Sequence, residues 1–219
     1  MFKGSIVALV TPIKGGDVDL DALTRLLDWH LAAGTHALVV LGTTGESATL
    51  TDVERMTVLD HALSHVDGRL PVIAGTGSNA TAKAIAYTRQ AKSAGADAAL
   101  IVTPYYNKPD QAGLLGHFSA IADAIDIPQM LYNVPGRTGC DLLSETVARL
   151  AKHPNVVALK DATGDMSRLT ELLEQYDTDI ALLSGDDSTT LDFMTLGGHG
   201  AISVTANVVP EHMAAMMQA

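Results

Sequence analysis

Cysteine, basic side chains and long apolar runs are all scarce in this sequence. Cys140 is the only cysteine among 219 residues, so no disulfide can form within the chain and nothing indicates an oxidising compartment. Lys and Arg total 14 against 25 Asp and Glu, which gives a formal net charge of −11. Because the chain offers no basic cluster to neutralise phosphates, nucleic acid is not an expected partner.

No apolar run approaches the ~18 residues that indicate a membrane-spanning helix. The first run, 5–10, ends at Thr11 and Pro12, which is too early for the core of a signal peptide. We therefore expect a soluble, cytoplasmic protein. What the chain does have is length and a hydrophobic content of 47%, enough for a sizeable buried core.

Short apolar segments typical of strands recur along the chain, separated by segments with helical spacing such as the leucines at 20, 23, 27 and 31. Thr51 and Glu54 form a capping-box pattern at the start of one such segment. This alternation predicts a parallel sheet, and eight units favour a (β/α)8 barrel over the alternative, an open doubly wound sheet. The expected strands are 5–10, 37–41, 72–74, 98–102, 129–132, 156–159, 181–183 and 201–204.

The chain contains no internal linker, so we expect a single barrel domain over residues 1–219. Residues 211–219 begin a helix with Met213, Met216 and Met217 on one side, but this segment covers only about two and a half turns. We therefore expect an eighth helix that is cut short within the barrel.

Lys160 is the most informative single residue. It closes the apolar run 156–159, and the ends of buried parallel strands are where α/β-barrel enzymes collect their chemistry. Partial desolvation there would lower the pKa of the amine from ~10.4 toward ~7–8, at which a neutral nucleophile is available. The simpler interpretation is a solvated lysine that leans off a strand end.

Other polar side chains follow the expected strands and would meet Lys160 at one rim of a barrel. Two hydroxyls in the glycine-framed loop 42–47, Thr43 and Thr44, could bind a small carboxylate. Tyr132 would end the strand next to that of Lys160 and could carry protons for it. Arg137 could clamp a second carboxylate, although a solvated loop arginine has the same appearance in sequence.

Several further patterns have ordinary structural explanations. Asp186 and Asp187, after the seventh strand, are more typical of turns and helix caps than of paired catalytic carboxylates. Residues 75–80 match a dinucleotide-binding glycine pattern, but the following acid, Asp97, precedes a strand instead of ending one. His61 and His65 have the spacing of a zinc site without its glutamate or a third ligand, so we expect a solvated helix face.

Taken together, the blocks 42–47 and 132–139 and the strand that ends at Lys160 resemble the dihydrodipicolinate synthase family of pyruvate-dependent class I aldolases. The likeness covers residues 1–219 almost continuously. It implies a TIM barrel and a lyase that condenses pyruvate with L-aspartate 4-semialdehyde to 4-hydroxy-tetrahydrodipicolinate, on the diaminopimelate route to lysine. It also implies a homo-oligomer, a dimer of dimers, with no metal and no organic cofactor.

The resemblance also implies a role for each residue at the rim. The catalytic residues would be Lys160, which forms a Schiff base with pyruvate, and a proton relay of Tyr132, Thr43 and Tyr106, the last supplied by a neighbouring subunit. The substrate-binding residues would be Thr44 for the pyruvate carboxylate, Arg137 for the semialdehyde carboxylate, and the backbone carbonyls of Gly185 and Ile202.

Relatives in this family can bind lysine as an inhibitor, and four residues match that effector site: Ser47, Ala48, Asn79 and Tyr105. However, Asp52, Arg55 and Lys83 stand where lysine-sensitive bacterial members carry two histidines and a glutamate. Because Lys83 replaces an acid that would pair with the ammonium group of the ligand, we expect weak or absent inhibition by lysine.

Two alternatives stay open at the level of sequence. Sialic-acid-cleaving lyases (N-acetylneuraminate lyases) are similar around the lysine and the tyrosine but lack an arginine like Arg137, so a different pyruvate-dependent aldolase is the first. The second is a non-catalytic truncated fragment, because family members continue through the eighth helix into a helical carboxy-terminal domain whose absence would leave an apolar edge exposed.

Overall fold

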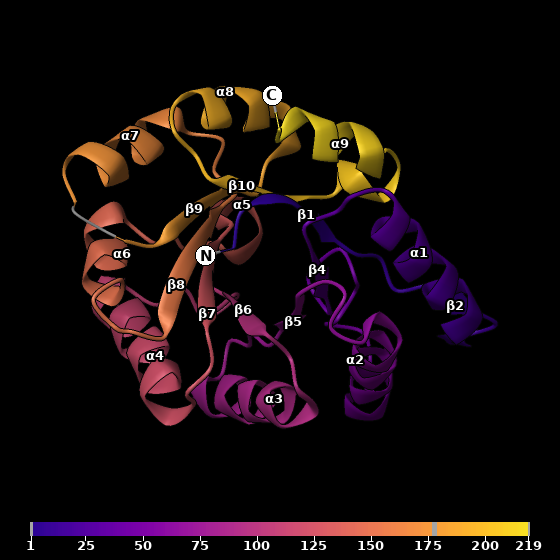
Figure 1. Cartoon of the computed structure of the whole chain (residues 1–219). Coiled ribbons are helices and arrows are strands. Elements are labelled where there is room, and N and C mark those ends of the chain that lie inside the picture. Colours follow the sequence, from indigo (N-terminus) through magenta and orange to yellow (C-terminus); the bar gives the residue numbers. More distant parts are fainter. Residues whose placement is uncertain (1, 177–178, 219) are drawn as a thin grey trace.

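A closed ring of eight parallel strands forms the centre of the molecule (Figure 1), as seen in a computed structural model that describes residues 2–176 and 179–218. Going around the ring, the strands follow the order β1, β10, β9, β8, β7, β6, β5, β4. Their bounds are β1 Gly4–Ala8, β4 Ala37–Val40, β5 Val72–Gly75, β6 Ala98–Val102, β7 Gln129–Asn133, β8 Val156–Asp161, β9 Ala181–Ser184 and β10 Gly200–Ser203. All eight expected strands are confirmed, and the doubly wound sheet is excluded.

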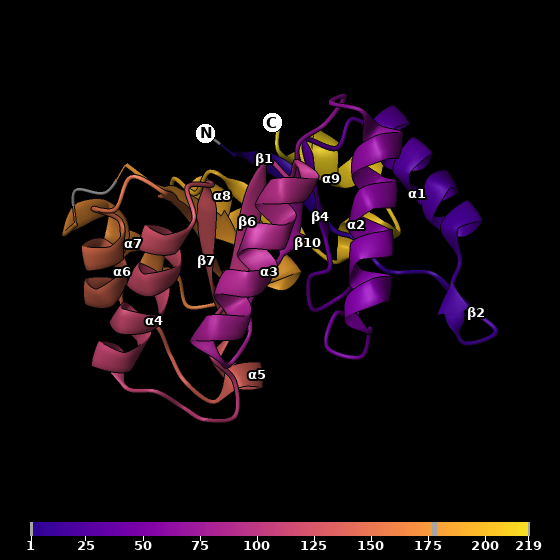
Figure 2. The ribbon, with the colours of Figure 1, turned by 90° about the horizontal axis from the view of Figure 1, so that it is seen from below.

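Helices follow the strands and surround the ring (Figure 1). They are α1 Leu20–Ala32, α2 Asp52–Val66, α3 Thr81–Ala94, α4 Gln111–Ala124, α6 Ser144–Leu150, α7 Met166–Glu174, α8 Thr190–Thr195 and α9 Pro210–Met216. A short helix, α5 (Pro135–Thr138), follows β7 and lies at the opposite end of the barrel from the amino terminus (Figure 2). This end is therefore the rim formed by the carboxyl ends of the strands.

Each barrel strand is buried on both faces, which explains its continuous apolar sequence. In β4, Ala37 and Val39 pack inside the barrel, whereas Leu38 and Val40 pack outward against the helices. The same alternation holds around the ring, because successive side chains of a strand point to opposite faces. A side chain's position in its strand thus decides whether it reaches the barrel interior or the helical layer.

Pairing between β1 and β10 closes the barrel, with Ile6 opposite Ile202. Asn207, in the 3-10 turn η2 (Thr205–Asn207), adds a second link at the rim. Its side-chain amide donates to the Ala8 carbonyl at 2.8 Å and its side-chain oxygen accepts from the Val10 amide at 3.1 Å. The first and last strands of the barrel are therefore held together by side-chain as well as backbone hydrogen bonds.

The capping box that Thr51 and Glu54 predict is present at the start of α2. Two features lie outside the sequence prediction: α5, and an antiparallel hairpin of β2 (Ile13–Lys14) and β3 (Asp17–Val18). The last helix, α9, ends at Met216, and its buried Met213 packs with the cluster between the helices and β1. Among the described residues, no helix has the length and apolar character needed to cross a membrane.

Candidate active site

Lys160 points into the barrel. On β8 the preceding Leu159 packs outward among the helices and Ala158 packs in the interior, so strand alternation turns Lys160 inward. Only 5% of the residue is exposed. The structure therefore contradicts a solvated lysine and confirms a desolvated amine at the end of a buried strand.

Tyr132 is the last but one residue of the adjacent strand β7, and it pairs directly with Lys160, which has the same position in β8. The Lys160 Nζ atom lies 4.2 Å from the centroid of the tyrosine ring. The strands are neighbours, as expected, but each continues for one residue beyond the pair, to Asn133 and Asp161. A tyrosine packed against the amine is a candidate proton carrier for a group that forms on it.

Burial shifts the ionisation of both groups. It lowers the pKa of Lys160 to about 8; Asp187 opposes that shift and Arg137 adds to it. Burial also raises the pKa of Tyr132. A side-chain hydrogen bond with Thr43 and the positive charge of Arg137 lower this pKa, but their effect is smaller. At neutral pH the amine is thus partly neutral and the phenol holds its proton, which suits a nucleophile beside a proton donor.

Gly185 and Ile202 both border the lysine end of the barrel. Gly185 follows β9, and a Cβ atom at this position would lie 2.9 Å from the Lys160 Cε atom and 2.8 Å from the Ala162 Cβ atom. A glycine is therefore needed to leave room for the lysine side chain. Ile202, on β10, is 1% exposed and packs in the barrel interior.

A cavity of about 600 Å³ opens at the rim beside α2, α3 and α5. It brings together Thr43, after β4, and Arg137, on α5, and both side chains are exposed. Thr44 is half-buried in the same loop as Thr43 and does not line the cavity. The space is of the size expected for a small-molecule site, with a hydroxyl and a guanidinium on its wall.

Tyr106 is 89% exposed, and its backbone has a φ of 75°, in the left-handed region that is unusual for a residue other than glycine. Its backbone N–H donates to the Thr138 carbonyl at 3.3 Å. Within one chain the tyrosine is therefore turned to solvent, away from Lys160. Its contribution to a neighbouring subunit stays a prediction.

Three of the four residues assigned to an effector site line the same cavity: Ser47, Ala48 and Tyr105. The fourth, Asn79, accepts a hydrogen bond from the Asn107 side chain through its backbone carbonyl. Two cations, Arg55 and Lys83, line this part of the cavity together with the Asp52 carboxylate, which accepts from the Tyr87 hydroxyl. The Arg55 guanidinium stacks 4.2 Å from the Tyr87 ring centroid, and the Lys83 Nζ lies 5.1 Å from it.

The glycine pattern at 75–80 has a packing explanation. A Cβ atom on Gly75 would lie 2.0 Å from the Leu41 carbonyl oxygen, and one on Gly77 would lie 2.5 Å from the Val102 nitrogen. Asp97 accepts from the Val72 amide at 2.7 Å and so supports the start of β5. These glycines allow neighbouring strand ends to approach each other closely, so the pattern has a packing role.

The expected solvated face at His61 and His65 is wrong in part, because both rings bridge α2 to α1. His61 Nε2 lies 2.8 Å from Thr24 Oγ1, and His65 Nε2 lies 2.6 Å from Asp28 Oδ1. Among residues 2–176 and 179–218, no group of three or more His, Cys, Asp or Glu side chains could hold a metal ion.

The two acids in the loop after β9, Asp186 and Asp187, have the turn and capping roles expected of them. Asp186 caps the 3-10 turn η1 (Asp187–Thr189), and Asp187 accepts from the Val204 and Thr205 amides at 2.9 and 2.8 Å. What the sequence prediction missed is the electrostatic effect of Asp187 on Lys160. The only signal in the sequence was that Asp187 follows the strand next to that of Lys160. This position is equally compatible with a turn-capping carboxylate and with one that faces the site.

Fold and site together define a class, a (β/α)8-barrel enzyme with a buried lysine and a tyrosine at the ends of adjacent strands. The family model described as "Dihydrodipicolinate synthetase family" matches residues 1–219, and the chain belongs to this family. A curated 4-hydroxy-tetrahydrodipicolinate synthase from Alcanivorax borkumensis is 60% identical over 100% of this chain and 75% of that protein.

Solved structures of the family agree with this assignment. A dihydrodipicolinate synthase from Acinetobacter baumannii, complexed with pyruvate, has a TM-score of 0.97 and 50% identity over 100% of this chain and 75% of that one. A lysine-bound enzyme from Cyanidioschyzon merolae has a TM-score of 0.95 and 44% identity over 99% and 74% of the two chains.

Proposed function

We propose that this protein is a 4-hydroxy-tetrahydrodipicolinate synthase, a lyase that joins pyruvate to L-aspartate 4-semialdehyde through a Schiff base on Lys160. One observation carries the proposal: a buried amine whose pKa is lowered to about 8 stands 4.2 Å from the ring of Tyr132. Curated relatives with this activity, 54–60% identical to the chain, support the choice of substrates.

In this mechanism the neutral Lys160 amine attacks the ketone carbon of pyruvate. The carbinolamine loses water to give an imine, and loss of a methyl proton gives an enamine whose carbon attacks the aldehyde of the second substrate. Cyclisation through the amino group of that substrate then displaces the lysine and restores the free amine. Tyr132 and Thr43 move protons during these steps, and Tyr106 of a neighbouring subunit completes the relay.

The two substrate carboxylates need separate partners. Thr44, in the loop after β4, is assigned to the carboxylate of pyruvate, and Arg137 to that of the semialdehyde. The position of Arg137 on the wall of the cavity, together with Thr43, supports this division because a guanidinium binds a carboxylate through two parallel hydrogen bonds. Gly185 and Ile202 are assigned to the same site through their backbone carbonyls. No cofactor takes part in the proposed steps.

Borohydride trapping tests the proposal. Reduction in the presence of pyruvate should leave a stable adduct on Lys160, detected by mass spectrometry of peptides. Lys160→Ala should abolish the adduct, whereas Lys152→Ala, at an exposed lysine on the outside of the barrel, should keep it. An adduct on another lysine, or none in a folded protein, would contradict the proposal.

Turnover with L-aspartate 4-semialdehyde tests the second substrate. Arg137→Leu should keep the pyruvate adduct but lose most of the turnover, because the guanidinium is assigned to the second substrate only. If the wild-type protein forms the adduct yet does not consume the semialdehyde, the assignment of this substrate is wrong and another aldehyde acceptor has to be sought.

A further inference from the structure

A network of charged and amide side chains lies on the outer side of β7 and β8, directly behind the reactive pair. Asn133 and Asp161 follow Tyr132 and Lys160 in sequence, and the two pairs form consecutive rungs of the same ladder. Strand alternation turns Tyr132 and Lys160 inward and their successors outward. A contact that fixes Asn133 or Asp161 therefore also fixes the backbone of Tyr132 and Lys160.

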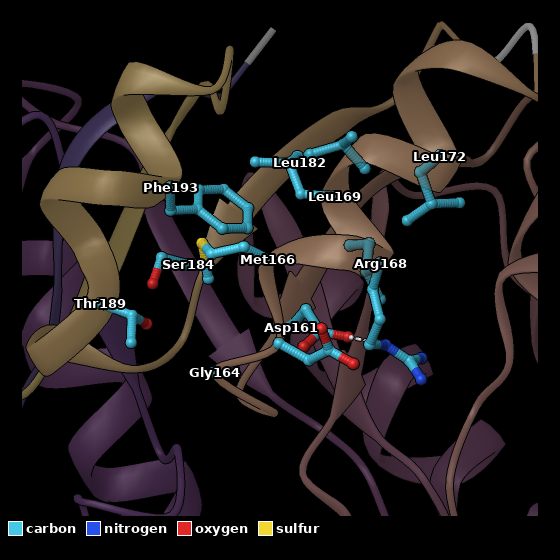
Figure 3. A pocket seen from close by; sticks show the side chains of 12 residues that line it. Asp161, Gly164, Met166, Arg168, Leu169, Leu172, Leu182, Ser184, Thr189 and Phe193 are labelled. Atoms are coloured by element: carbon cyan, nitrogen blue, oxygen red, sulfur yellow. Dashed lines mark hydrogen bonds and ion pairs between the residues drawn. The ribbon is translucent and has the colours of Figure 1, made fainter.

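Arg168, on the first turn of α7, joins this outer rung. Its Nε donates to Asp161 at 3.2 Å and its Nη1 donates to Asp141 at 2.9 Å, while Nη2 donates to the Leu142 carbonyl. Figure 3 shows Arg168 and Asp161 side by side, joined by this interaction. The side chains of Arg168 and Asp161 are only 13% and 10% exposed, so their contact is shielded from solvent, whereas the Asp141 side chain is 38% exposed.

Asn133 links the two carboxylates from the strand side. Its amide nitrogen donates to Asp141 at 2.8 Å and to Asp161 at 3.3 Å, and its oxygen accepts from the Leu142 amide at 3.0 Å. The other oxygen of Asp161 accepts from the backbone and the hydroxyl of Thr163. Each member of the network is thus satisfied, which is the condition under which a buried polar cluster makes a structure rigid.

We propose that Arg168 is a positioning residue for Lys160: by binding Asp161 and Asp141 behind β8 and β7, it fixes the strand ends that place the lysine against Tyr132. The inference rests on the proposed function, since it concerns the geometry of the Schiff-base step. A displacement of about 1 Å in such a pair can cost on the order of 100-fold in rate. The planar guanidinium is required because one group must reach both carboxylates and a carbonyl.

The surroundings leave little room for another group to take this place. The cavity next to Arg168, between α7 and α8, measures only about 10 Å³, and half of its lining residues are apolar, including Met166, Leu169 and Phe193 (Figure 3). If Arg168 is lost, Asp161 and Asp141 face each other across Asn133 without a cation. We expect the end of β8 to loosen as the two carboxylates separate.

The test compares Arg168→Lys and Arg168→Met with wild type. At saturating pyruvate, the rate of adduct formation on Lys160 should fall roughly 10-fold in the first variant and up to about 100-fold in the second. The concentration of pyruvate at half-maximal rate should change little. The pH midpoint should also stay in place, because Asp187, Arg137 and Tyr132, the groups that face Lys160, are untouched.

Leu59→Ala is the matched control for stability. Leu59 is a buried residue of α2. It packs in a hydrophobic cluster separate from the one around the outer faces of β7 and β8, so its truncation lowers the melting temperature without touching these strands. If Arg168→Met slows adduct formation no more than Leu59→Ala does, Arg168 has only a general structural role and the proposal is overturned. If Arg168→Met does not fold, Arg168→Lys and Asp141→Asn are compared with wild type instead. Wild-type rates of adduct formation in both variants would overturn the positioning role of Arg168.

Hydrogen exchange separates this proposal from the proposed function. The amides of residues 156–162 should exchange faster in Arg168→Lys than in wild type, while those of β4 and β5 should not. This readout needs no pyruvate, so it stays informative if wild type forms no adduct. A uniform change in exchange over the whole barrel, or no change at 156–162, would overturn the positioning role.

Discussion

At Lys160, burial and a neighbouring carboxylate act on the same amine in opposite directions. Burial is the larger effect and lowers the pKa to about 8, while Asp187 raises it. At pH 7 about a tenth of such amines are neutral, compared with roughly one in 3,000 for a solvated lysine. The barrel therefore supplies the nucleophile mainly by removing water from it.

This pKa predicts how adduct formation depends on pH. Only the neutral amine attacks pyruvate, so the rate of borohydride-trapped adduct formation should rise with pH up to about 8 and then level off. The measurement is the single-turnover rate of trapping between pH 6 and pH 10. A rate that is still rising tenfold per pH unit above pH 9 would show that Lys160 titrates like a solvated lysine.

Gly185 gives a second prediction at this scale. In Gly185→Ala, the new methyl group would lie 2.9 Å from the Lys160 Cε atom, so the lysine side chain has to move. We expect adduct formation to slow roughly 10- to 100-fold, measured as above. Gly116→Ala is the control: apart from its chain neighbours and the backbone of α4 itself, no atom lies within 4 Å of that Cβ position, so its rate should equal that of wild type. Equal rates in both variants would contradict the steric role of Gly185.

The residues proposed for catalysis and the residues around them differ in how far sequence could predict them. Lys160 and Tyr132 end apolar runs, and adjacent strand ends meet in any barrel, so their contact followed from strand order. The need for glycine at position 185 could not be predicted in this way, because the crowding there arises from the pairing between β8 and β9. The role of Arg168 was not predicted for a similar reason: its partners, on strand β8 and in the loop before α6, meet it only in the folded chain.

At the scale of elements, apolar runs located every barrel strand, because strands buried on both faces leave a continuous signal in sequence. The hairpin of β2 and β3 left no such signal. Its strands have two residues each, both of β2 are exposed, and only the turn at Gly15 and Gly16, with φ values of 65° and 99°, marks it. Short exposed pairings depend on turn geometry, which apolar periodicity does not report.

The walls that α2 and α3 contribute to the cavity carry a prediction about regulation. Arg55 is 7% exposed and donates to the Ser47 and Gly75 carbonyls, so it cannot swing away, and Lys83 stands beside it at the Tyr87 ring. Two cations there repel the ammonium group of a bound amino acid. We expect L-lysine to inhibit only above millimolar concentrations in a steady-state assay.

Lys83→Glu tests the cause of the expected insensitivity to lysine. Reversing the charge removes one repulsion and adds an acceptor for the ammonium group, so inhibition by lysine should become up to roughly tenfold stronger. Lys92→Glu, at an exposed lysine near the far end of α3, is the control and should leave inhibition unchanged. Sub-millimolar inhibition of the wild-type protein would contradict the prediction.

At the scale of the whole molecule, the barrel separates two kinds of chemistry. Its interior side chains are apolar except near the rim, where Lys160 and Tyr132 meet, and the polar groups behind them face the helical layer. Neutral histidines occupy that helical layer as well. His30 on α1 is fully buried and His117 on α4 is 6% exposed, and burial lowers the pKa of each to about 4.

These two histidines predict a loss of stability in acid. Above pH 6.5 they are neutral in both the folded and unfolded states. As pH falls from about 6.5 to 4, these histidines become protonated in the unfolded chain but stay neutral in the folded protein. The free energy of unfolding therefore falls over this window. Below pH 4 the folded protein also binds the proton and this contribution levels off. Each ring accounts for roughly 1–3 kcal/mol.

Chemical denaturation at pH 7 and pH 4.5 measures the effect, and the contribution of one ring is isolated by substitution. His117 makes its hydrogen bond to Thr81 through Nδ1, and its Nε2 is buried without a partner among the described residues, so His117→Gln keeps a polar group while removing the titration. The stability difference between the two pH values should shrink in this variant but not in His212→Gln, at an exposed position on α9. An unchanged difference in His117→Gln would show that other groups, such as carboxylates that titrate in the same range, are responsible for the acid sensitivity.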